Sequence, residues 1–121
     1  MDYRQELGLL GEDLAVRELE RRGYAILARR YRTRFGEIDI VAEDRGVVVF
    51  VEVKARRNAR YGSAVEAVSW WKQRRISTMA LDYLSRTRRP NVPCRFDVVA
   101  IDRLGAADQL VRLYRDAFVA S

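Results

Sequence analysis

Asp39, Glu52 and Lys54 are the residues whose types and spacing in this sequence best suit hydrolytic chemistry. They flank a hairpin signal at residues 44–46, Asp-Arg-Gly. A two-residue loop there places Asp39 opposite Glu52, and it also places Glu37 opposite Lys54. Residues opposite one another share a face of the sheet, with Cβ atoms about 5 Å apart, and so do residues two apart along a strand. Three carboxylates and one ammonium group are therefore predicted to converge on one small patch.

This patch is expected to bind Mg²⁺ or Mn²⁺. Carboxylates so close together repel one another, and a hard cation is one way to keep them ionised. Asp39 and Glu52 are the expected ligands, with the carbonyl of Val53 as a third. A metal-bound water has a lowered pKa and can attack a phosphodiester, while Lys54 would orient that water or neutralise charge on the phosphate.

An ordinary ion-pair network on a solvated sheet face is the alternative, with Glu37 paired to Lys54. The segment 47–55 weighs against it, because it is apolar on both faces and a buried charge cluster costs stability unless it is paired or metal-bound. Without a metal, Lys54 is expected to pair with one of the carboxylates.

Glu12 is a further candidate, because it borders the apolar stripe of the first predicted helix and could point at the Asp39 patch. Its alternative role is a buried stem with the carboxylate in water. Asp97 is expected to be structural, as the partner of an arginine. Cys94, the single cysteine, is expected to be buried in a strand rather than to act as a nucleophile.

The composition narrows the chemistry further. The chain has no histidine, which removes the usual general base and the commonest zinc ligand. Its net charge of +6 favours a polyanionic partner such as nucleic acid, or less often an anionic membrane surface. Only Lys54 and Lys72 of the 23 basic residues are lysines. A lysine among so many arginines indicates that these two positions require a compact ammonium group rather than a planar guanidinium group.

Basic residues that follow the site in the sequence are expected to hold a DNA backbone. They are Arg56, Arg57 and Arg60 directly after it, and Lys72, Arg74 and Arg75 on the second predicted helix. Tyr61 or Trp71 could stack an unpaired base. The alternatives are that these arginines are only solvated and that Trp70 and Trp71 belong to the core.

The elements that must position these residues follow the order αβββαββ. The first predicted helix spans 2–22, and the second starts at a capping box of Ser63 and Glu66 and ends between 86 and 90. The predicted strands span 24–31, 37–43, 47–55, 94–102 and 109–115. A helix between two strands usually brings them parallel, so a mixed central β-sheet flanked by helices is expected, in one domain over 1–121. The sequence has no apolar run of about 18 residues and does not start with a basic and apolar leader, so we expect a cytoplasmic protein without a membrane segment.

The segments G-E-I-D-I-V-A at 36–42 and V-F-V-E-V-K-A-R at 49–56 resemble the D…E-x-K signature of the restriction-endonuclease-like, or PD-(D/E)XK, nuclease superfamily. With G-E-D-L-A at 11–15 and R-F-D-V-V-A-I at 95–101, the whole chain resembles the YraN-like bacterial family of that superfamily. The resemblance implies an α/β three-layer core, although Ile38 stands where the proline of the superfamily's name would precede the aspartate. Archaeal Holliday-junction resolvases are similar in arrangement. That similarity implies a catalytic set of Glu12, Asp39, Glu52 and Lys54.

Metal-dependent hydrolysis of DNA phosphodiester bonds, at branched or damaged structures, is therefore the leading functional expectation. Two alternatives stay open. One is a non-catalytic nucleic-acid-binding domain, and the other is a protein-interaction module that serves DNA uptake, recombination or repair beside a DNA-processing partner. A single domain of this size must form a homodimer if it is to cut two strands symmetrically.

Overall fold

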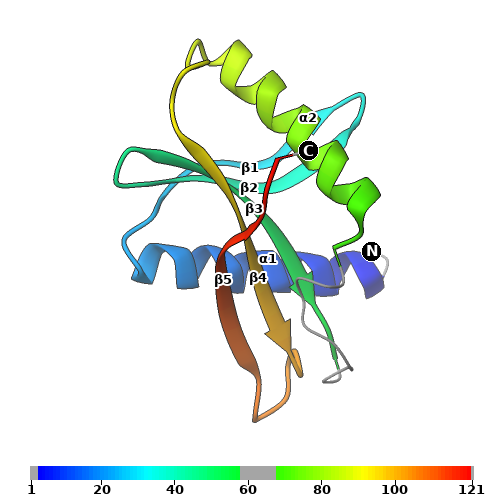
Figure 1. Ribbon diagram of the computed structural model, residues 1–121. Coiled ribbons are helices and arrows are strands. Elements are labelled where there is room, and N and C mark those ends of the chain that lie inside the picture. The colour runs from blue at the N-terminus through cyan, green and yellow to red at the C-terminus, as the bar shows by residue number, and fades with distance from the viewer. Residues whose placement is uncertain (1–2, 58–67, 121) are drawn as a thin grey trace.

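The computed structural model describes residues 3–57 and 68–120 of the chain (Figure 1). In these ranges lie two helices and a sheet of five strands in the order β1-β2-β3-β4-β5. The elements are α1 Tyr3–Arg21, β1 Ala25–Thr33, β2 Gly36–Asp44, β3 Val47–Ala55, α2 Trp70–Arg86, β4 Cys94–Asp102 and β5 Leu110–Phe118. The predicted order αβββαββ is confirmed.

The sheet is mixed and forms the middle of three layers. Strands β3 and β4 pair in parallel, and the other three neighbouring pairs are antiparallel. Helix α1 crosses behind the sheet and α2 lies in front of it in Figure 1. The chain from β3 through α2 to β4 thus makes the crossover that the sequence predicts for a helix between parallel strands.

Strand β3 is buried on both faces and separates two apolar cores. Val48 and Phe50 pack with α2, in a cluster that includes Ile76 and Met79. Val49 and Val51 point the other way, into a cluster that includes Ala15 and Leu19 of α1. Even-numbered residues of β3 therefore face α2 and odd-numbered ones face α1, as the period of two requires.

The turn between β2 and β3 has the predicted register. Asp44 pairs with Val47, which leaves Arg45 and Gly46 as a two-residue loop. Both loop residues have positive φ, 50° and 85°, as a type I′ hairpin turn needs.

Helix α1 approaches the sheet closely at Gly11. A Cβ atom there would lie 2.7 Å from the Cβ of Ala55, closer than real Cβ contacts. Glycine is therefore the residue that lets this helix lie against the end of β3. The helix ends at Arg21, and Gly23 follows with a φ of 89°.

Helix α2 begins later than the capping box predicts. Its first residue is Trp70, and the Ser69 side chain caps it by accepting a hydrogen bond from Lys72 N at 3.2 Å. Ser63 and Glu66 lie outside the described residues. Its C-terminus at Arg86 agrees with the prediction.

The predicted burial of Cys94 is wrong. Cys94 is exposed, because it is the first residue of β4 and lies at the margin of the sheet. Trp70 and Trp71 are also exposed, so the alternative that they belong to the core does not hold. Among the described helices, none is both long and apolar enough to cross a membrane.

Candidate active site

Strands β2 and β3 separate at the candidate site. Their ladder runs from the turn to the pair Ile40 and Val51. Beyond that pair, the backbone N–H of Val53 donates to Oδ2 of Asp39 at 2.8 Å. The carboxylate of Asp39 therefore occupies the place where the next rung of the ladder would be.

Glu52 continues the alternation of β3 from Phe50, which packs under α2, and it therefore faces that helix. The predicted register of the hairpin is confirmed from the pair Asp44 and Val47 as far as the pair Ile40 and Val51. Asp39 lies one residue beyond the last of these pairs, close enough to Glu52 and Lys72 for their charges to shift its pKa.

The predicted convergence of three carboxylates is wrong, because the alternation of β2 breaks beside Asp39. Ile38 packs into the core under α2, whereas Ile40 packs into the core over α1. In β1 a matching irregularity occurs at Arg30, whose φ is 52°. Glu37 is thereby removed from the patch, and it pairs with Arg32 of β1 at 3.5 Å. No group of three or more acidic, cysteine or histidine residues close enough to hold a metal ion occurs within 3–57 and 68–120.

The two remaining carboxylates are electrostatically coupled. Burial, and after it the charge of Glu52, raises the pKa of Asp39 to about 7. The hydrogen bond from Val53 N and the charge of Lys72 lower this pKa and offset part of the rise. Near neutral pH the second negative charge at this site is therefore only partly compensated by the protein.

Lys72 is the cation that pairs with Glu52. Its Nζ lies 2.5 Å from Oε1 of Glu52, whose side chain is only 3% exposed. The prediction that Lys54 would collapse onto a carboxylate is wrong. Lys54 is half-buried on the same face, two residues beyond Glu52, and no described acidic residue forms an ion pair with it. The sequence pattern assigns Lys72 to the DNA backbone alone, although its rarity as a lysine already marks it.

Glu12 is buried, as its place beside the apolar stripe predicts, but two arginines hold it. Arg29 Nε donates to one carboxylate oxygen at 2.7 Å and Arg30 Nε donates to the other at 3.0 Å. The charge of Glu12 still contributes to the raised pKa of Asp39. Glu12 thus lies near Asp39 and Glu52, but its hydrogen bonds are to the arginines of β1.

The basic residues predicted to bind DNA are not equivalent. Arg56 pairs with Asp102 at 2.8 Å, with both side chains 15% exposed, so its guanidinium has a structural partner. Arg57 is exposed at the end of β3, and Arg75 is exposed on α2. Arg60 and Tyr61 lie outside the described residues.

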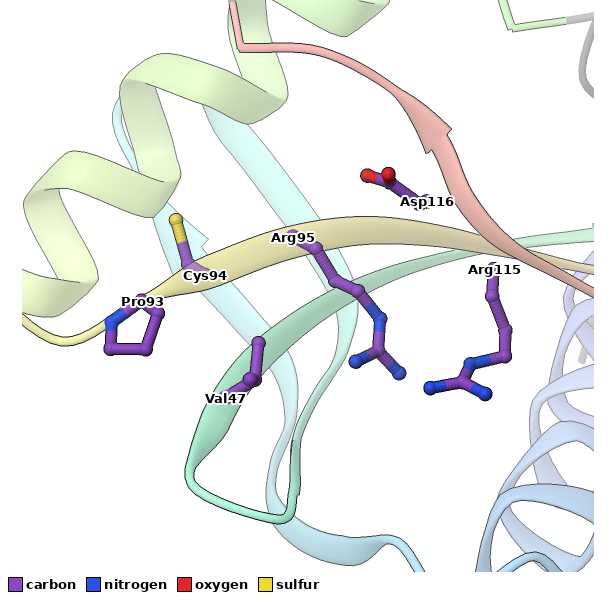
Figure 2. A pocket seen from close by; sticks show the side chains of 6 residues that line it. All are labelled: Val47, Pro93, Cys94, Arg95, Arg115 and Asp116. Atoms are coloured by element: carbon purple, nitrogen blue, oxygen red, sulfur yellow. The ribbon is translucent and has the colours of Figure 1, made fainter.

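A second polar cluster lies at the other end of β3 and β4. Asp97 is fully buried and accepts hydrogen bonds from Tyr24 Oη, Arg95 Nε and the backbone N–H of Asp116. Arg95 and Arg115 extend side by side in Figure 2 and share Oδ2 of Asp44. The predicted structural role of Asp97 therefore agrees with its surroundings, and this cluster is separate from the Asp39 site.

Comparisons with known proteins agree with the motifs. The uncharacterised protein family UPF0102 matches residues 11–101. A UPF0102 protein of Symbiobacterium thermophilum is 47% identical over 96% of this chain and 98% of its own length. One from Desulfosudis oleivorans is 45% identical over 100% of this chain and 96% of its own, and one from Rhodococcus opacus is 43% identical over 98% and 100%. The chain therefore belongs to the UPF0102 family, the YraN-like family that its motifs indicate.

Proposed function

We propose that this protein is a divalent-metal-dependent endonuclease that hydrolyses DNA phosphodiester bonds. The observation that carries the proposal is the pair of Asp39 and Glu52. The two carboxylates lie close together where β2 and β3 separate, and the charge of Glu52 helps to hold the pKa of Asp39 near 7. A site that keeps two repelling carboxylates together costs stability, and such sites are concentrated where chemistry is done.

The donor set fits Mg²⁺ or Mn²⁺. Magnesium prefers oxygen ligands and is often held by only one or two carboxylates, its other positions being filled by water and phosphate. Asp39 and Glu52 would supply the carboxylates, and the carbonyl of Val53 would supply a third oxygen. A divalent ion would polarise a phosphoryl oxygen and lower the pKa of a bound water.

The residues of this chain would then act on the phosphodiester itself. In hydrolysis a water oxygen forms a bond to phosphorus and the bond to one sugar oxygen breaks, which leaves a phosphate monoester and a sugar hydroxyl. Lys54, on the same face as Glu52, would orient the water or stabilise the charge that develops on the phosphoryl oxygens. Lys72 supplies the positive charge that pairs with the buried Glu52 carboxylate.

The order αβββαββ and the placement of Asp39, Glu52 and Lys54 on one hairpin support membership of the restriction-endonuclease-like superfamily. The likeness to Holliday-junction resolvases favours branched DNA as the substrate. Glu12 has the helical position that this likeness requires, but its two arginine partners make it a residue that positions β1 against α1.

The second candidate function is a non-catalytic nucleic-acid-binding module, on its own or beside a DNA-processing protein. The ion pair between Lys72 and Glu52 favours it, because this pair already satisfies the buried carboxylate without a metal.

An assay on branched, nicked, single-stranded and linear DNA with Mg²⁺ or Mn²⁺ separates the two. Glu52→Gln and Asp39→Asn should each lower the cleavage rate by at least about a hundredfold, because each removes a metal ligand. Glu37→Gln is the matched control, since Glu37 lies on the same strand but pairs with Arg32 outside the site.

Cleavage that needs the metal and survives only in the wild type and Glu37→Gln supports the endonuclease. If none of the four substrates is cut with either metal, or if cutting persists in Asp39→Asn and Glu52→Gln, the endonuclease is refuted. If the protein still binds DNA in that case, the result supports the non-catalytic nucleic-acid-binding module.

A further inference from the structure

Two tryptophans stand in solvent at the start of α2. Trp70 is 53% exposed and Trp71 is 69% exposed. Their rings meet edge to face, with centroids 4.9 Å apart and planes at 71°. Large aromatic rings usually contribute their area to a core or an interface, so a pair left in water needs a separate reason.

The pair is held in place by its own neighbours. The guanidinium of Arg74, one helical turn on, lies 5.0 Å from the centroid of the Trp70 ring. The Ser69 cap fixes the first turn of the helix on which both rings stand. Trp70 thus contacts both Arg74 and Trp71, and Trp71 is the more exposed ring.

The position of the pair connects it to the carboxylate site. Trp71 is the residue before Lys72, whose ammonium group contacts Glu52. Adjacent Cα atoms are about 3.8 Å apart, so the backbone of Trp71 belongs to the turn of α2 that reaches the site, while its exposed ring leaves that turn in another direction than the Lys72 side chain.

The surroundings of the pair are basic. Arg74 and Arg75 are exposed on the same helix. The turn between β1 and β2 lies beside this part of α2 in Figure 1, and a Cβ on Gly36 would lie 3.6 Å from Cδ of Arg75. That turn carries exposed Phe35, with Arg34 4.9 Å from its ring centroid. Exposed rings and guanidinium groups therefore alternate over this surface.

We infer that Trp71, braced by Trp70, is a stacking platform for an unpaired nucleobase of a DNA strand that enters the Asp39–Glu52 site. Aromatic rings beside arginines are the usual means by which proteins hold single-stranded nucleic acid, because every base has a face that can stack and every nucleotide carries a phosphate. An uncharged apolar partner would not match the adjoining arginines. The inference rests on the proposed function, since it names single-stranded segments as the part of the substrate that the site receives.

Binding without cleavage tests the platform. The full-length protein is titrated, in EDTA, into a fluorescein-labelled oligothymidylate and into an abasic oligonucleotide of the same length, and anisotropy reports the affinity. Trp71→Ala is compared with Trp71→Phe, which keeps a stacking ring. Leu81→Ala is the matched control, because Leu81 is 70% exposed further along the same helix.

Trp71→Ala should weaken oligothymidylate binding about tenfold, and up to about a hundredfold, because stacking of one base on an aromatic ring is lost. Trp71→Phe should restore most of this loss, and Leu81→Ala should bind as the wild type does. The abasic strand should bind the wild type and Trp71→Ala equally. The dependence of affinity on salt should be the same in both, since no phosphate contact changes.

Equal affinity of Trp71→Ala and wild type for oligothymidylate would overturn the inference, and so would an equal loss on the abasic strand. Because the assay contains no metal, absence of cleavage leaves this result unaffected. If the protein cuts no DNA but its binding still depends on the bases and on Trp71, the proposed endonuclease activity is refuted and the stacking role of Trp71 is supported.

Discussion

Lys72 of α2 and Glu52 of β3 form an ion pair of 2.5 Å across the layer between helix and sheet. The charge of Lys72 also lowers the pKa of Asp39, so one ammonium group serves both carboxylates. The first turn of α2 therefore completes the electrostatics of a site whose acidic groups lie on the β2–β3 hairpin. A divalent cation bound as proposed would compete with this ammonium group for the Glu52 oxygens.

Replacing Lys72 by Met should expose this competition. The buried Glu52 then loses its cation, and the free energy of unfolding should fall by about 2 kcal/mol, less than for a fully buried pair because Lys72 is 38% exposed. Mg²⁺ should raise the melting temperature of Lys72→Met more than that of the wild type, because the competing ammonium is gone.

The double variant Lys72→Met with Glu52→Gln is the control for this change. It should regain much of the lost stability, because no unpaired Glu52 charge is buried, and it should respond less to Mg²⁺, because one of the two carboxylate ligands is gone. A melting temperature of Lys72→Met that is unchanged by Mg²⁺ would count against a metal at this site.

The raised pKa of Asp39 predicts that stability falls as pH rises. The unfolded chain releases this proton near pH 4, whereas the folded protein keeps it until about pH 7. The folded state therefore binds more protons between these values, and the contribution is largest below pH 4, declines up to pH 7 and is level above it. The decline should be on the order of 4 kcal/mol in metal-free protein.

Denaturant unfolding from pH 4 to pH 8 in EDTA measures this dependence. Asp39→Asn is the reference, because its side-chain oxygen can still accept from Val53 N and it cannot titrate. The free energy of unfolding of the wild type, relative to that of Asp39→Asn, should fall by this amount as the pH rises from 4 to 7. If the two curves run parallel through this range, Asp39 titrates normally in the folded protein.

Two glycines of α1 should respond in opposite directions to alanine. Gly11→Ala brings a Cβ to 2.7 Å from that of Ala55 and should destabilise the protein by about 1–3 kcal/mol through overpacking. A Cβ at Gly8 would meet nothing within 4 Å, so Gly8→Ala should stabilise by about 0.5–1 kcal/mol through helix propensity.

Adding Ala55→Gly to Gly11→Ala removes the contact and should recover part of the loss, as chemical denaturation would show. Equal effects of the two single variants would mean that α1 does not press on β3 at Gly11.

Arg56 should matter for stability rather than for DNA. Arg56→Ala breaks a largely buried ion pair with Asp102 and should cost about 1–2 kcal/mol of unfolding free energy, as should Asp102→Asn. Arg75→Ala, at an exposed position, should leave stability unchanged and reduce the salt dependence of duplex binding by about 0.9 in the logarithmic slope if it contacts one phosphate. A reduced slope in Arg56→Ala would reassign that residue to the DNA surface.

The sequence predicts the scaffold of the site well, because the signals that set it are local. The dipeptide Arg45-Gly46 fixes the hairpin register as far as Ile40 and Val51, and this register brings Asp39 and Glu52 to the same end of the hairpin. The apolar runs of β3 and β4 predict a buried parallel pair in the same way.

The parts that could not be predicted depend on contacts distant in the sequence. The break in alternation beside Asp39 is matched by Arg30 in another strand, and no pattern within β2 announces it. The pairing of Glu52 with Lys72 depends on where α2 crosses the sheet. Trp70 and Trp71 are exposed because they lie off the face of α2 that Ile76, Met79 and Tyr83 turn to the core.

The two pairings of β3 differ greatly in the length of chain that they close. Its hairpin with β2 closes over two residues, whereas Val48 meets Cys94 only about 46 residues later, and long closures are slow to form. During folding, Asp39 and Glu52 are therefore expected to meet before α2 delivers Lys72. Two like charges then oppose an early step, so the wild type should refold faster at pH 5 than at pH 8 in stopped-flow measurements, and Asp39→Asn should not. Asp39 and Glu52 are thus expected to repel one another during folding until α2 packs on the sheet and Lys72 pairs with Glu52.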